Sequence, residues 1–164
     1  MSVVQRHQPS GLNHLPNLYS EIQPRLWQGG TAREQVIDRE QLLTKFHEVE
    51  RQFDAVATLY PWAAPMQWGI EERRLGFPDG ELKAEYLAQI ESIADWAHAH
   101  WASGRRVLVR CAGGMNRSGL VTAMVLMRAG HSADAAISLV RQGRSQDALS
   151  NGSFVAYLRS VDRA

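Results

Sequence analysis

A short segment of the chain combines a thiol, two adjacent glycines, a guanidinium and a hydroxyl in a spacing that suits phosphate chemistry. It runs from Cys111 to Gly119 and reads Cys-Ala-Gly-Gly-Met-Asn-Arg-Ser-Gly. Apolar runs at residues 107–109 and 120–127 flank it, so we expect a loop between a buried strand and a buried helix. Such a loop can bind a phosphate dianion and present a thiolate to it.

Each residue type in this loop has a part in that chemistry. The backbone amides of residues 112–117 can converge on one anion, and glycines allow the dihedral angles that such a nest needs. The positive end of the following helix favours Cys111 as a thiolate. Arg117 has the planar fork that binds two phosphate oxygens, and Ser118 can donate a hydrogen bond to the departing sulfur. The predicted phosphate-binding residues are Ala112, Gly113, Gly114, Met115, Asn116 and Arg117.

The same cysteine could instead be an inert residue of the core. Cys111 is the only cysteine in the chain, and buried cysteines outside disulfides are usually inert. The glycines, the serine after Arg117 and the apolar runs on both sides make a demanding pattern, which favours catalysis. One cysteine cannot form an internal disulfide or a cysteine-rich metal site, and it suits a reducing compartment.

Alternating strand and helix patterns predict the elements that position the loop. We expect strands at residues 21–27, 53–59, 70–75 and 107–109, and helices from 31 towards 46, over 82–101, 118–127 and 132–141, and from 151 onwards. Thr31 with Glu34 forms a capping-box pattern, and Ser132 and Asn151 can cap the last two helices. This order predicts a single α/β domain with a central, mostly parallel twisted sheet and helices on both faces.

Composition and charge exclude several classes of function. A net charge of +1 over 164 residues provides no field that would favour nucleic acid. No run of about 18 apolar residues is present, so we expect no membrane span. Residues 1–15 lack the apolar core of a signal peptide, which makes the cytoplasm the expected location. We expect a flexible N-terminal arm over residues 1–17 and the catalytic domain over 18–164; the oligomeric state is not predicted.

The segment from Cys111 to Gly119 resembles the signature loop of cysteine-dependent protein phosphatases, and the chain length resembles their dual-specificity branch. Residues 24–30 resemble the family's first-strand segment, and residues 148–154 resemble the segment before its last helix. Asp79 stands where the family carries its general acid. The resemblance covers about residues 20–160 and implies a protein-tyrosine-phosphatase-like fold. It departs at Arg110, where the family usually has a histidine that orders the loop and poises the thiol.

The resemblance implies a phosphate monoester hydrolase that needs no metal ion or other cofactor. Cys111 attacks phosphorus to form a phosphocysteine, while Arg117 and the loop amides hold the equatorial oxygens. Asp79 protonates the leaving oxygen and then activates water. Taken alone, Asp79 in its Pro-Asp-Gly turn is explained by turn chemistry, and Glu81 is an alternative acid. The implied partners are phosphotyrosine proteins, also phosphoserine and phosphothreonine proteins, or small phosphate esters, and no nucleic acid.

Two other functions stay open at this point. The first is the same chemistry on a non-protein phosphate, such as an inositol phosphate, a phosphoinositide or an RNA 5′-phosphate. The uncharged residues 112–116 and the low net charge argue against it. The second is a non-catalytic phosphate-binding module, which would need neither Cys111 nor Asp79.

Five other large side chains were considered for a part in the site or the surface. Trp62 and Met66, with Trp68, could form a wall for an aromatic phospho-substrate, or could simply cover the core. Arg141 and Arg144 are predicted to be exposed charges that favour the dipole at the end of a helix.

Overall fold

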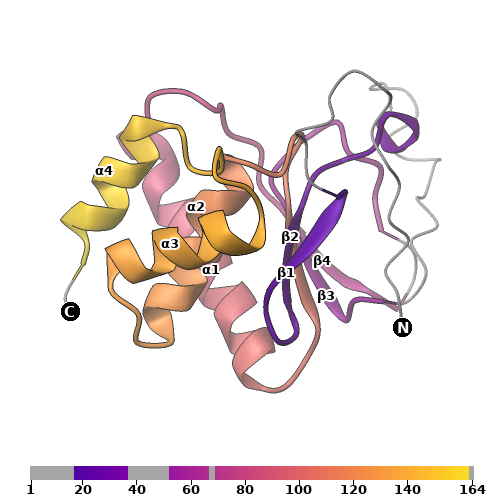
Figure 1. The fold of residues 1–164 in the computed structure, drawn as a ribbon. Coiled ribbons are helices and arrows are strands. Elements are labelled where there is room, and N and C mark those ends of the chain that lie inside the picture. The colour runs from indigo at the N-terminus through magenta and orange to yellow at the C-terminus, as the bar shows by residue number, and fades with distance from the viewer. Residues whose placement is uncertain (1–16, 37–51, 67–68, 163–164) are drawn as a thin grey trace.

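The computed structural model describes residues 17–36, 52–66 and 69–162, and its centre is a five-stranded sheet with the order β1-β2-β5-β3-β4 (Figure 1). The strands are β1 (Tyr19–Gln23), β2 (Leu26–Gly29), β3 (Ala55–Thr58), β4 (Glu71–Arg74) and β5 (Val107–Arg110). β2, β5, β3 and β4 run parallel, and only β1 pairs antiparallel with its neighbour. The predicted α/β class and the mostly parallel sheet are confirmed.

The first predicted strand, residues 21–27, is a hairpin in the structure. β1 ends at Gln23 and β2 begins at Leu26, so Pro24 and Arg25 form the turn. Arg25 has a φ of 69°, which is a left-handed conformation that ends a strand. The prediction of one continuous strand was wrong because it did not use Pro24, which favours the first central position of a tight turn.

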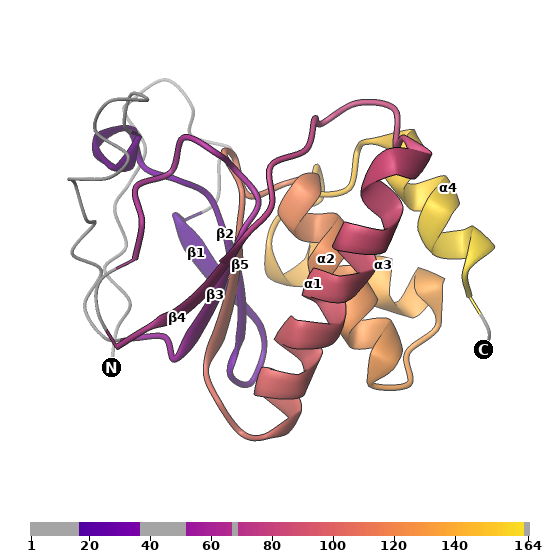
Figure 2. The ribbon, with the colours of Figure 1, turned by 180° about the vertical axis from the view of Figure 1, so that it is seen from behind.

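The α-helices are α1 (Ala84–Ala102), α2 (Arg117–Arg128), α3 (Ala133–Gly143) and α4 (Gly152–Ser160). All four lie on one side of the sheet (Figures 1 and 2). The 3-10 helix η1 (Arg33–Gln35) lies on the other side. Helices were predicted on both faces. In the part of the chain that the structure describes, the α-helices cover one face and a single 3-10 turn lies on the other. Caps follow the prediction for two helices: the side chain of Ser132 accepts from Ala135 N, and that of Asn151 accepts from Ser153 N and Phe154 N.

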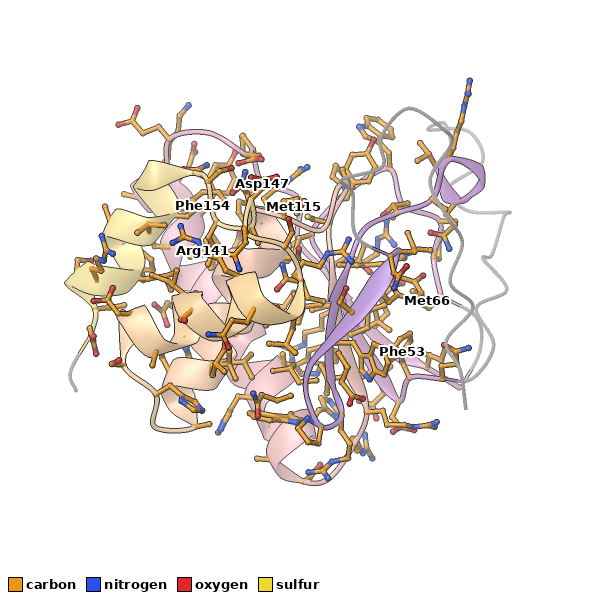
Figure 3. All side chains as sticks on the ribbon, in the orientation of Figure 1. Phe53, Met66, Met115, Arg141, Asp147 and Phe154 are labelled. Atoms are coloured by element: carbon orange, nitrogen blue, oxygen red, sulfur yellow. The ribbon has the colours of Figure 1, made fainter. Side chains whose placement is uncertain are left out.

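The alternation of side chains along β5 separates two hydrophobic cores. Val107 and Val109 pack with residues of the helices in a large core, whereas Leu108 packs in a small core on the other face. Figure 3 shows members of both: Phe154 lies on the helix side of the sheet, and Phe53 and Met66 lie on the other side. β5 is the middle strand and is buried on both faces, so the loop that follows it rests on a rigid base.

Two sequence predictions fall wholly or partly outside the described residues. The predicted arm covers residues 1–17, of which only Asn17 is described; its carbonyl accepts a hydrogen bond from Arg144. The predicted helix from Thr31 extends into residues 37–51, which are not described. No helix in the described part of the chain is long and apolar enough to cross a membrane.

Candidate active site

The loop of residues 111–117, called the cysteine loop below, connects the end of β5 to the start of α2 as predicted. Cys111 is 2% exposed. Its Sγ lies 3.2 Å from Ser118 Oγ, and the backbone amide of Gly114 donates to the sulfur at 3.2 Å. The structure thus brings the predicted nucleophile, the predicted hydroxyl and a loop amide to one point at the N-terminus of α2, where a helix favours an anion.

Gly114 has the left-handed conformation that the nest requires. Its φ is +74°, and a Cβ there would lie 2.5 Å from the carbonyl carbon of Gly29 and 2.6 Å from Nη2 of Arg144. A Cβ on Gly30 would likewise lie 2.8 Å from the Ala112 oxygen. The cysteine loop therefore packs directly on the end of β2, and only glycine fits at these close approaches.

The carbonyls of the cysteine loop are held from outside. Gly114 O accepts from Gln28 Nε2 and from Arg144 Nε, both at 3.0 Å, and Gly113 O accepts from Arg144 Nη2 at 3.3 Å. The hydroxyl of Thr31 donates to Cys111 O at 2.8 Å. Residues outside the loop thus satisfy these carbonyls and fix the loop backbone, whose Gly114 amide donates to the sulfur, and we expect further loop amides to bind an anion.

Thr31 therefore has a different role from the predicted capping box. The hydrogen bond of the cap runs instead from the Ala32 amide to Gln35 Oε1, at 2.7 Å. The sequence pattern located the start of a helical turn but placed it one residue early. The hydroxyl of Thr31 is used to hold the cysteine loop, a long-range contact that no local pattern indicates.

Arg144 is the functional residue that the sequence prediction missed. It was expected to be an exposed charge, but it is 6% exposed and donates to the cysteine loop, to Asn17 and to Ser20. Burial lowers the pKa of Arg144 to about 10, and attraction to Cys111 opposes that shift. Its guanidinium is thus a buried cation that a negative charge on Cys111 would favour.

Arg141 was also predicted to be exposed, and that prediction is wrong. Its Nε donates to Ala148 O at 3.1 Å and its Nη2 to Leu149 O at 3.0 Å. Leu149 N in turn donates to Met115 O of the cysteine loop at 3.1 Å. Figure 3 shows Met115 beside the segment that contains Asp147, on the helix side of the sheet. Arg141 therefore supports the cysteine loop through the segment before α4.

Arg117, the predicted phosphate ligand, is the first residue of α2. Its Nη1 donates to Phe77 O at 3.3 Å, and its Cζ lies 5.6 Å from the centre of the Tyr60 ring. Its buried Nε has no hydrogen-bond partner among the described residues. The guanidinium is held by a carbonyl and an aromatic face, and it keeps donors that an oxyanion can accept from.

Asp79, the predicted acid, is held by two amide side chains. Asn116 Nδ2 donates to Asp79 Oδ2 at 3.1 Å, and Asn151 Nδ2 donates to Asp79 Oδ1 at 2.8 Å. Asn151 Nδ2 also donates to Gly80 O at 2.9 Å. The acid loop is therefore tied to the cysteine loop through Asn116 and to the N-terminus of α4 through Asn151. From the sequence, only the backbone of Asn116 is predicted to belong to the site.

The remaining residues singled out from the sequence differ in their exposure to solvent. Trp62 is 42% exposed, so it does not cover the core, whereas Met66 is buried in the small core. Trp68 lies outside the described residues. Glu81, the alternative acid, is exposed.

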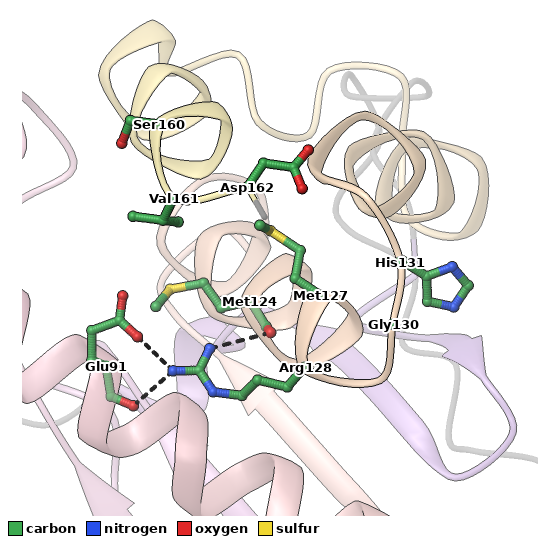
Figure 4. A pocket seen from close by; sticks show the side chains of 9 residues that line it. All are labelled: Glu91, Met124, Met127, Arg128, Gly130, His131, Ser160, Val161 and Asp162. Carbon is green, nitrogen blue, oxygen red and sulfur yellow. Dashed lines mark hydrogen bonds and ion pairs between the residues drawn. The ribbon is translucent and has the colours of Figure 1, made fainter. Parts of the chain in front are cut away.

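A cavity of about 740 Å³ lies elsewhere, between α1, α2 and the end of α4 (Figure 4). Met124, Met127 and Val161 give it apolar walls, and Arg128 lines it while paired with Glu91. No residue of the cysteine loop lines it, so it is not part of the candidate active site. In the described residues no group of three or more His, Cys, Asp or Glu side chains is placed to hold a metal ion.

Comparisons with known proteins give a family match and several solved structures of similar fold. The model of the dual specificity phosphatase catalytic domain matches residues 66–164. Human DUSP28 is 25% identical, with a TM-score of 0.71 over 90% of this chain and 95% of that one. A mouse putative dual specificity phosphatase, solved with zinc tungstate, is 23% identical, with a TM-score of 0.70 over 96% and 92% of the two chains.

A third solved structure is PTPMT1 in complex with PI(5)P, which is 18% identical with a TM-score of 0.64, over 87% of this chain and 93% of that one. At this identity the likeness concerns the fold. No curated protein matches the sequence of this chain.

Proposed function

This chain belongs to the dual specificity phosphatase family, and on that premise we propose that it cleaves phosphate from proteins through a phosphocysteine formed on Cys111. Its enzyme class is that of the tyrosine and dual-specificity protein phosphatases. The observation that carries the proposal is the arrangement around Cys111 Sγ. A loop amide and a hydroxyl meet the sulfur, and the same loop holds Asp79 through Asn116.

In the first step, the Cys111 thiolate attacks phosphorus and the S–P bond forms as the bond to the leaving oxygen breaks. Asp79 transfers its proton to that oxygen, so the leaving group departs as a neutral alcohol or phenol. Arg117 and the inward amides of the cysteine loop bind the equatorial oxygens, where negative charge accumulates in the transition state.

In the second step, water attacks the phosphorus of the phosphocysteine while the Asp79 carboxylate accepts a proton from it. The S–P bond breaks, which releases inorganic phosphate and returns the thiolate. Ser118 Oγ, 3.2 Å from the sulfur, donates a hydrogen bond to the thiolate as it leaves. No step uses a metal ion, and a thiolate nucleophile works best in a reducing compartment such as the cytoplasm.

The preferred substrate is phosphotyrosine, with phosphoserine and phosphothreonine as further substrates. PTPMT1, which shares the fold, was solved with a phosphoinositide, so a lipid headgroup is the natural competitor. Residues 112–116 of the cysteine loop carry no charged side chain, which disfavours a highly charged headgroup over a phosphotyrosine.

The test is phosphate release, in the presence of a chelator, from phosphotyrosine, phosphothreonine and phosphoserine peptides, a phosphoinositide and a 5′-triphosphorylated RNA. We expect the phosphotyrosine peptide to be cleaved fastest and the chelator to have no effect. Cys111→Ser should lower kcat at least about 1,000-fold, and Asp79→Asn about 100-fold with little change in KM.

The matched control for the acid is Asp95→Asn, because Asp95 is an exposed carboxylate of α1 that pairs with Arg128 of α2. It should keep the turnover of the wild type. Full activity of Cys111→Ser would end the proposal, and a faster reaction on the phosphoinositide or RNA would replace the substrate.

A further inference from the structure

Arg110 ends β5 directly before Cys111, but its contacts lie on the opposite face of the sheet. Alternation places Arg110 on the same face as Leu108, a member of the small core, whereas Cys111 packs in the large core. The Arg110 side chain has no exposed surface. The position where a loop-ordering histidine was expected therefore holds a buried cation that serves the other face.

Three acceptors surround the Arg110 guanidinium. Nε donates to Thr58 Oγ1 at 3.0 Å, and Nη2 donates to Ala64 O at 2.7 Å and to Glu72 Oε2 at 3.2 Å. Burial lowers the pKa of Arg110, and the Glu72 carboxylate opposes this shift. The fork thus joins β5 to β3, to β4 and to the connection between them.

Glu72 extends these contacts to residues 60–66, which belong to the connection between β3 and β4. Its Oε1 accepts from the Met66 amide at 3.2 Å, and its Oε2 accepts from Arg74 Nη1 at 3.2 Å. Arg74 Nη2 then donates to Ala63 O at 2.6 Å and to Pro61 O at 3.2 Å. Together with the bond from Arg110 to Ala64 O, these contacts fix the 60–66 segment at four backbone groups.

The 60–66 segment forms one side of the site of Arg117. Its first residue, Tyr60, presents its ring 5.6 Å from Arg117 Cζ. Next to it, the Pro61 ring lies 3.3 Å from the position that a Cβ on Gly76 would occupy. Gly76 directly precedes Phe77, whose carbonyl accepts from Arg117 Nη1. Both groups that hold the Arg117 guanidinium therefore depend on where the 60–66 segment lies.

We propose that Arg110 is a positioning residue, which fixes the 60–66 segment so that Tyr60 holds the Arg117 guanidinium in its oxyanion-binding orientation. This inference rests on the proposed function, since it concerns the anion site of the same loop. The residue before the cysteine would thereby affect binding of the phosphoryl group, although its side chain lies on the opposite face of the sheet. Arginine is required because one planar fork bonds to Thr58, Ala64 and Glu72 at once, which a lysine ammonium cannot reproduce in the same geometry.

The experiment measures the affinity of the protein for inorganic phosphate by NMR titration, together with kcat and KM on a phosphotyrosine peptide. The variants are Arg110→Lys, Tyr60→Leu, Tyr60→Phe and the double variant Arg110→Lys/Tyr60→Leu. The control is Arg106→Lys, because Arg106 lies at the opposite end of β5 in a surface pair with Asp54. A thermal melt checks that each variant is folded.

We expect Arg110→Lys and Tyr60→Leu each to weaken phosphate binding and to lower kcat/KM about fivefold, in keeping with the loss of a partly desolvated cation–π contact. The double variant should resemble the more affected single variant, because both changes act through one contact. Tyr60→Phe keeps the ring and should recover most of the loss, and Arg106→Lys should match the wild type.

Effects of Arg110→Lys and Tyr60→Leu that multiply, or unchanged phosphate affinity in Tyr60→Leu, would overturn the inference. Tyr60→Leu alone decides if Arg110→Lys does not fold. Phosphate affinity separates the two proposals: a protein that binds phosphate in this pattern but releases none from any ester keeps the inference and loses the proposed function.

Discussion

Two arginines are buried on opposite faces of the sheet at the same end of β5, and the partners of their positive charges differ. Arg110 has a carboxylate partner, Glu72. Arg144 donates to carbonyls and to the hydroxyl of Ser20, and no carboxylate among the described residues forms an ion pair with it. The group that attracts its charge is Cys111. Arg110 is therefore expected to act through geometry, and Arg144 through geometry and charge.

This contrast explains how the cysteine loop can do without a histidine before the cysteine. The loop carbonyls are held by Gln28, Thr31 and Arg144, which all lie on the outer side of the loop. Arg144, directly after α3, is a buried positive charge that a negative charge on Cys111 would favour. The position before the cysteine is consequently free to stabilise the other face, where Arg110 holds the 60–66 segment.

The largest effect in this comparison is expected for Arg144→Met. The change removes hydrogen-bond donors from the carbonyls of Gly113 and Gly114, so the loop loses contacts that fix its shape. It also removes a buried positive charge that favours an anion in the loop. We expect kcat/KM on a phosphotyrosine peptide to fall about 100-fold, or about 3 kcal/mol of transition-state stabilisation. Steady-state kinetics of Arg144→Met beside Arg110→Lys measure it. A smaller loss in Arg144→Met than in Arg110→Lys would reverse the comparison.

An effect of intermediate size is expected on the rate of alkylation of Cys111, and it distinguishes the charge of Arg144 from its hydrogen bonds. Alkylation of Cys111 by iodoacetamide at neutral pH requires the thiolate. Removing the cation that attracts it, in Arg144→Met, should slow alkylation on the order of tenfold, whereas Arg110→Lys should leave the rate within about twofold of the wild type because its charge and its face are unchanged. Mass spectrometry of timed samples gives both rates. Equal slowing in the two variants would show that Arg144, too, acts only through geometry.

The smallest effect is expected for Gln28→Leu. Gly114 O has a second donor in Arg144 Nε, so the loss of Gln28 leaves this carbonyl satisfied. We expect kcat/KM to fall about threefold and the free energy of unfolding to fall by about 1 kcal/mol. Kinetics and urea unfolding measure the two changes. A loss as large as that of Arg144→Met would mean that both donors are needed and that the field of Arg144 adds little.

The parts of the molecule that could be predicted depend on short-range patterns. The strand before Cys111 and the helix after Ser118 followed from the apolar runs on either side, and the caps at Ser132 and Asn151 followed from residue type. The hairpin at Pro24 was missed although its signal is local.

The residues that hold the site could not be predicted, because their partners are distant in the chain. Arg144 contacts Gly114 30 residues away, and Arg110 contacts Thr58 52 residues away. Neither arginine differs in its local sequence from one that lies at the surface. Burial of a guanidinium is decided by the acceptors that the fold brings to it. These acceptors are backbone carbonyls together with side-chain oxygens of Ser20, Thr58 and Glu72, and no local sequence pattern marks them.

Covalent phosphorylation of Cys111 during turnover is the step on which the proposed function depends. The test is rapid quench of Asp79→Asn with p-nitrophenyl phosphate, followed by mass spectrometry of the intact protein and its peptides. The nitrophenolate leaves without a proton, so the intermediate can form, while loss of the acid-base carboxylate slows its hydrolysis. We expect one added phosphoryl group on the peptide that contains Cys111, and none in Asp79→Asn/Cys111→Ala. Turnover by the wild type without any such adduct, or an adduct on another residue, would contradict it.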